Sequence, residues 1–60
     1  MNEKCHIYVW RYPDVNCHLP EASLQDCIAY IVYAAERGDV AAGYHFVIIS
    51  NETGEVMYES

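Results

Sequence analysis

Positively charged residues are scarce in this sequence. Its 60 residues include 3 Lys and Arg but 9 Asp and Glu, so the formal net charge is −6 at pH 7. Proteins that bind nucleic acids need clustered Lys and Arg to contact the phosphates. The scarcity of positive charge therefore argues against a nucleic-acid partner. If the partner is a charged protein, the excess of negative charge on this chain favours a basic partner.

Long apolar runs are missing as well. The longest, Cys27–Ala35, has nine residues and is interrupted by tyrosines, whereas a membrane-spanning helix needs about 20. The N-terminus shows no basic segment followed by an apolar one, so we expect no secretory signal. Three cysteines are an odd count, which fits reduced thiols better than a disulfide framework. We therefore expect a cytoplasmic protein without a membrane partner.

The Cys and His residues do not form a recognisable metal-binding or catalytic motif. Zinc sites usually contain closely spaced pairs such as CxxC, whereas here Cys5-His6 and Cys17-His18 are adjacent pairs. Neighbouring residues on a strand point to opposite faces, so such a pair does not easily serve one ion. Thiol catalysis needs a base beside a pocket, and so short a chain has little room for one. We expect no enzymatic activity, no metal and no other cofactor.

A small metal-binding or thiol-dependent module is the alternative hypothesis. Its candidate residues are Cys5, Cys17, Cys27 and His45. Buried cysteines usually behave as small hydrophobic residues, so the protein-interaction hypothesis below is preferred.

Hydrophobic content is high enough for a folded protein. Hydrophobic residues make up 53% of the chain and charged residues 20%, which argues against disorder. The length allows one compact domain over residues 1–60, near the size at which a single core barely suffices.

One helix is well marked between Ser23 and Arg37. Ser23 is a suitable N-cap, and Asp26 follows in the first turn, where the helix dipole favours negative charge. Gly38 is the type of residue that ends helices in a left-handed conformation. Apolar residues fall on one continuous arc of this helix: Leu24, Cys27, Ile28, Ile31, Val32, Ala34 and Ala35. This arc is expected to face the core, with Tyr30 and Tyr33 on the outer arc.

Three segments rich in β-branched and aromatic residues are expected as strands: Cys5–Tyr12, Tyr44–Ser50 and Glu55–Glu59. Residues 51–54 are expected as a turn with Gly54 at positive φ. Residues 13–22 are expected as a loop, although Val15–Leu19 could add an edge strand. The fold class is therefore α+β: a two-layer β-α-β-β arrangement with one helix on a small three-stranded mixed sheet. A crossover through the helix predicts that the first two strands are parallel neighbours.

Alternation along the strands separates two faces of this sheet. The face under the helix is expected to contain Ile7, Val9, Val47, Ile49, Val56 and Tyr58. The other face is expected to contain Tyr8, Trp10, Tyr44, Phe46, Ile48 and Met57. A different strand register, with an ordinary exposed face, is the alternative.

The second face suggests a function because one helix cannot cover both sides of a sheet, and an uncovered face is normally polar. We expect a small acidic, non-catalytic interaction module that binds a protein partner or a second copy of itself through this face. The alternative cover is the loop of residues 13–22, folded beneath the sheet. Tyr30 and Tyr33 are weaker interface candidates, since tyrosine is enriched at interfaces. By analogy with small acidic chains that lack catalytic motifs, the expected role is that of a regulator or inhibitor, including the accessory type encoded by phages and prophages.

Overall fold

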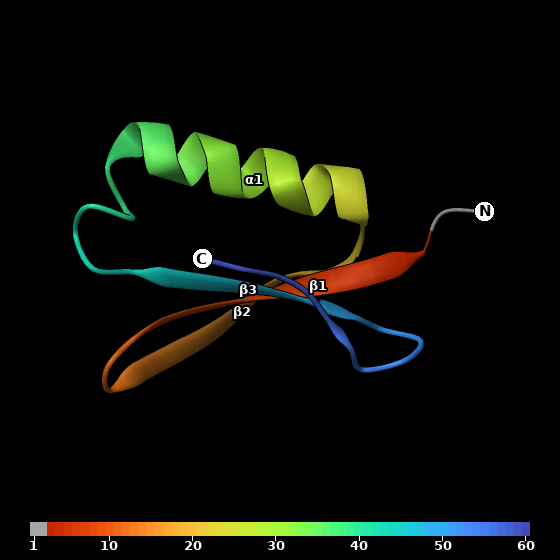
Figure 1. Ribbon diagram of the computed structural model, residues 1–60. Helices are drawn as coiled ribbons and strands as arrows, with labels where there is room; N and C mark the ends of the chain where they lie inside the picture. The colour runs from red at the N-terminus through yellow and green to blue at the C-terminus, as the bar shows by residue number, and fades with distance from the viewer. Residues whose placement is uncertain (1–2) are drawn as a thin grey trace.

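The computed structural model describes residues 3–60 and contains four strands and one helix within them (Figure 1). The elements are β1 (Lys4–Arg11), β2 (Asp14–Ser23), α1 (Leu24–Arg37), β3 (His45–Ser50) and β4 (Val56–Glu59). The strands form one sheet in the order β2-β1-β3-β4, and all neighbouring pairs are antiparallel. Figure 1 shows α1 on one side of this sheet. The expected α+β class with one helix on a sheet is therefore confirmed.

The expected three-stranded mixed sheet is wrong. Residues 13–22, expected as a loop, lie almost wholly in β2, which pairs with β1 as a hairpin. The possible edge strand at Val15–Leu19 is thus confirmed, and it continues to Ser23. Because the hairpin reverses the chain before α1, β3 runs antiparallel to β1. The helix instead connects β2 and β3, which are parallel to each other with β1 between them.

The helix begins and ends where its capping residues predict. The Ser23 hydroxyl accepts a hydrogen bond from the Asp26 backbone N–H at 3.1 Å, which satisfies a free donor of the first turn. At the other end Gly38 has φ of 97°, and its N–H donates to the carbonyls of Ala34 and Ala35. A residue with a Cβ adopts this left-handed conformation only at a cost.

The turn between β3 and β4 is organised by a buried serine. The Ser50 hydroxyl accepts hydrogen bonds from the backbone N–H groups of Glu52 at 3.2 Å and Thr53 at 3.3 Å. The same hydroxyl donates to a carboxylate oxygen of Glu3. Gly54 has φ of 77°, so the expected positive-φ glycine is confirmed. The turn therefore satisfies a polar group that is buried at the end of β3.

The core lies between α1 and the two central strands. Its buried hydrophobic residues are Cys5, Ile7, Val9, Cys27, Ile31, Ala34, Phe46 and Ile48. The register of β1 and β3 places Ile7 opposite Ile48 and Val9 opposite Phe46, so that alternate residues of both strands face α1.

The expected face of β3 is wrong. Phe46 is only 1% exposed and Ile48 is fully buried, whereas both were expected on the uncovered face. Val47 and Ile49, expected under the helix, lie on the opposite side. Because β3 is apolar at both alternating positions, its sequence pattern does not distinguish the two faces, and a slip of one residue exchanges them.

Isoleucine-to-valine substitutions at adjacent positions test this assignment. We expect Ile48→Val to lower the free energy of unfolding by about 0.5–1.5 kcal/mol, because it removes a buried methylene and leaves a cavity. Ile49→Val makes the same chemical change on the partly exposed side and should cost clearly less. Urea denaturation of both variants measures the difference, and a larger loss for Ile49→Val would contradict the assignment.

Candidate functional site

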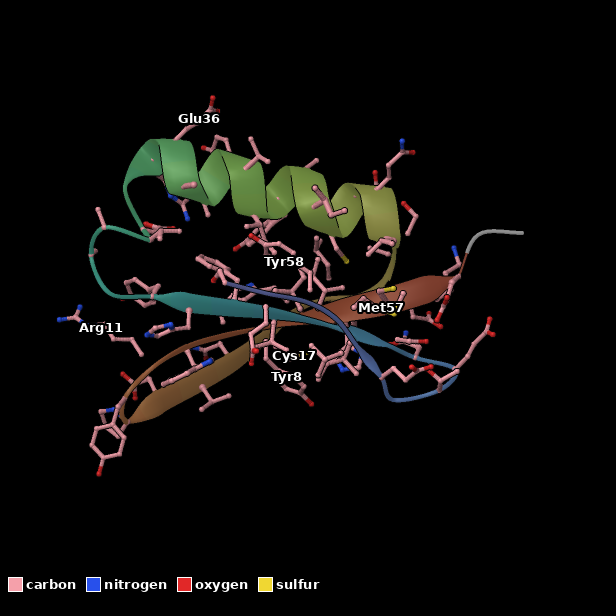
Figure 2. All side chains as sticks on the ribbon, in the orientation of Figure 1. Tyr8, Arg11, Cys17, Glu36, Met57 and Tyr58 are labelled. Carbon is pink, nitrogen blue, oxygen red and sulfur yellow. The ribbon has the colours of Figure 1, made fainter. Side chains whose placement is uncertain are left out.

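The side of the sheet that faces away from α1 is the candidate site, and we call it the open face. Alternation and strand register place residues of β1, β2 and β3 there: His6, Tyr8, Trp10, Val15, Cys17, His45, Val47 and Ile49. Tyr8 pairs with Cys17 on one side and with Val47 on the other. Figure 2 shows Tyr8 and Cys17 below the sheet, with α1 above it.

Two aromatic pairs organise the open face. Trp10 stacks on His45, with ring centroids 4.4 Å apart and an angle of 21° between the planes. Tyr8 meets the His6 ring edge-on at 5.1 Å. The side chains of Tyr8 and Trp10 are each 37% exposed, so they combine accessible apolar surface with ring contacts that restrict their rotamers.

The structure places some of the expected interface residues on the open face and not others. Tyr8 and Trp10 lie there. In β4 the pairing places Val56, expected under the helix, opposite Ile49 on this side, whereas Met57 lies at a register shift between Val56 and Tyr58. Phe46 and Ile48 lie in the core instead. Tyr44 lies just before β3 and packs partly buried against that core, with the Arg11 guanidinium 5.6 Å from its ring centroid.

The two helix tyrosines have different surroundings. Tyr30, expected on the outer arc, is partly buried: it stacks on His18 at 5.8 Å and meets the Phe46 ring at 6.5 Å. Tyr33 is exposed as expected, and the guanidinium of Arg37 lies 5.2 Å from its ring centroid. Arg37 also donates to Asp39, which raises the pKa of the guanidinium above its ordinary value. Neither tyrosine adjoins the open face.

Sequence reasoning missed Val47 and Ile49, which belong to the open face. His45 shares their alternating position in β3, but this polar signal is offset because Ser50, which is also polar, shares the position of Phe46 and Ile48. His6 and His45 were missed as well, since their role depends on the aromatic partners that only the strand register supplies.

Charge is sparse on the open face. Among the described residues of the strands, alternation puts Lys4, Glu21 and Glu59 on this side, each near the end of its strand. The region around Tyr8, Trp10 and Val47 therefore combines apolar surface with the two histidines, and Glu59, which pairs with Val47, borders it on the β4 side.

The four candidate metal-ligating residues do not come together. Cys5 and Cys27 are buried in the core, whereas Cys17 and His45 lie on the open face in strands separated by β1. Within residues 3–60, no group of three or more His, Cys, Asp or Glu is placed to hold a metal ion. Burial raises the pKa of the Cys5 and Cys27 thiols, assisted by Glu3 at Cys5 and by Cys5 at Cys27.

Comparison with known proteins does not extend this description. No protein-family model, curated protein or solved structure matches the chain. In the part of the chain that the structure describes, α1 falls short of the length and apolar character needed to cross a bilayer.

The burial of the thiols predicts two classes of reactivity. Cys17 is exposed and should react rapidly with an aromatic disulfide reagent at pH 8. Cys5 and Cys27 should react at least roughly 100-fold more slowly, because their reaction requires opening of a domain with about 0.05–0.15 kcal/mol of stability per residue. Their raised pKa values also reduce the thiolate fraction at that pH.

Absorbance of the released thiolate measures these rates, first in buffer and then in guanidinium chloride. Cys17→Ser should abolish the fast phase in buffer while two slow thiols remain. A fast phase that survives this substitution would show that a core cysteine is accessible.

Proposed function

We propose that this chain is a small, non-catalytic protein-interaction module that binds through the open face. The observation that supports this proposal is the exposure of Tyr8 and Trp10 on a sheet surface that α1 does not cover. An uncovered face of an antiparallel sheet is ordinarily polar. Trp and Tyr are also the residues that most often dominate binding energy at protein interfaces.

A second copy of the chain is the occupant that the charge distribution favours. Two chains carry a combined negative charge that opposes association through most surfaces, since each has a formal charge of −6. On the open face, Tyr8, Trp10 and Val47 bring no carboxylate to such a contact, and Glu59 borders it on the β4 side. Two open faces packed about 10 Å apart would form a sheet sandwich with one helix on each outer side.

The size of the open face predicts weak association. Four strands spaced about 4.8 Å apart, with about six residues each at about 3.3 Å, present roughly 400 Å² per copy. The two copies together would cover roughly 800 Å², below the 1,200–2,000 Å² or so of stable specific interfaces. We therefore propose a reversible dimer with a dissociation constant in the micromolar range or weaker.

The proposed setting is the cytoplasm, because the three cysteines are free thiols. There the module would act as an accessory regulator or inhibitor, by analogy with other small acidic chains. Reversible dimerisation through the open face would compete with binding of a foreign protein to that same face.

Replacing Trp10 with glutamate tests the proposal. For the unmodified chain, we expect the mass from light scattering to rise above the 6.9 kDa monomer as concentration increases. Trp10→Glu should remain monomeric over the same range, because it places a carboxylate at the centre of the contact. Circular dichroism should show that the variant keeps its helix.

Tyr33→Glu is the matched control, since it makes the same change on the outer side of α1 and should associate like the unmodified chain. Two results would contradict the proposal. One is a mass that stays at the monomer value up to millimolar concentration, together with the absence of any foreign partner whose binding requires Trp10. The other is association that Trp10→Glu leaves intact.

A further inference from the structure

The flank of α1 on the β4 side extends beyond the sheet and stays largely exposed. It packs on β1, β2 and β3, and Tyr30 fills the flank nearest His18 of β2. On the opposite flank, Ile28 is 44% exposed and Val32 is 52% exposed, although both were expected to face the core. These two residues are one turn apart and lie on the same side of α1. An apolar strip of the helix therefore extends beyond the sheet that it covers.

This strip forms one wall of a groove. Ile28, Ile31 and Val32 of α1 and Tyr58 of β4 line a cavity of about 120 Å³. Figure 2 shows Tyr58 between α1 and the sheet. Sites for drug-sized ligands usually have about 300 Å³ or more, so this groove suits a single apolar side chain.

The groove adjoins an open sheet edge. The Ser60 backbone N–H donates to the Phe46 carbonyl at 3.0 Å, so the N–H of Ser60 points toward β3. Because backbone groups alternate along a strand, the N–H and C=O of Glu59 point to the outer side. Unpaired groups of this kind can receive another strand. The opposite edge, in β2, is interrupted by Pro20 and by Leu19 with φ of 49°.

Negative charge surrounds the β4 edge. Glu55 and Glu59 stand at its two ends, and Glu36 follows Val32 by one turn on α1. The three cationic residues lie elsewhere: Lys4 in β1, Arg11 beside Tyr44, and Arg37 bonded to Asp39. The edge therefore presents backbone hydrogen-bonding groups and an apolar groove within an acidic surround.

We propose that the β4 edge binds an extended basic segment of a partner protein, which adds to the sheet as a fifth strand. One apolar side chain of the segment fills the groove, and its Lys or Arg residues lie near Glu55 and Glu59. Strand addition of this kind combines main-chain hydrogen bonds with side-chain pockets for specificity. A second copy of this chain is disfavoured here because it brings its own Glu55 and Glu59 to the edge. The groove of the β4 site lies on the helix side of the sheet, opposite the open face, and Glu59 borders both.

A synthetic heptapeptide, Lys-Thr-Lys-Leu-Lys-Thr-Lys, serves as the probe because its alternation puts one leucine on the groove side. Fluorescence anisotropy of the labelled peptide with the full chain should show saturable binding that weakens as salt increases. Binding should be lost when the four lysines are replaced by glutamate. Nuclear magnetic resonance should show the largest amide shifts at 56–59 and around Val32.

Two variants separate this site from the rest of the molecule. Val32→Ser should weaken peptide binding roughly threefold to tenfold, because part of the apolar contact is lost. Tyr33→Ser, the adjacent residue on the outer side of α1, should have no effect. Trp10→Glu should also leave peptide binding unchanged, which distinguishes failure at the β4 site from failure at the open face.

Four results of the peptide experiments would overturn the proposal. They are absence of saturable peptide binding, equal binding of the glutamate peptide, binding that Val32→Ser leaves intact, and amide shifts confined to β1 or β2. A dimer held by β4, detected as self-association that Val32→Ser abolishes, would also overturn it in favour of a second copy.

Discussion

The structure depends on the mismatch in width between one helix and four strands. A helix with its side chains is about 10–12 Å across, whereas four strands spaced about 4.8 Å apart span roughly 19 Å. A single helix therefore leaves part of its own side of the sheet uncovered and all of the other side. In this chain α1 packs toward β2, where Tyr30 contacts His18, and this position exposes the helix flank above β4. The open face and the β4 groove both follow from that geometry.

The small core makes polar connections at its margin important. Asn51 joins three segments, because its side-chain amide donates to the Pro20 carbonyl at 2.8 Å and its backbone N–H donates to the Lys4 carbonyl at 2.9 Å. Its side-chain carbonyl also contacts the His6 ring. The turn after β3 is thus tied to β1 and β2. These bonds restrict how far the outer strands can separate from the packed centre.

The elements with local signals were predictable from the sequence. The helix has a serine cap, a terminal glycine and an apolar period of 3.6, and the turn after β3 has Gly54. Strand β2 lacks such a signal, because Asn16, Cys17 and His18 interrupt its apolar residues at an exposed edge. The strand directions were consequently wrong, since they depended on whether β2 reversed the chain.

The candidate site was predictable only in part for a related reason. The side-chain alternation of β1 distinguishes Ile7 and Val9 from Tyr8 and Trp10, so its two faces were assigned correctly. In β3 the residues at both alternating positions are apolar. Only pairing with β1, which places Phe46 opposite Val9, decides that Phe46 is buried. The groove beside β4 depends on the lateral position of α1, which no local pattern encodes.

Ser23 has a mechanical consequence. It is the last residue of β2 and also the cap of α1, so the strand and the helix meet without a linker. The end of β2 therefore sets where α1 starts, and any displacement of Ser23 at the sheet edge displaces the first turn of the helix as well.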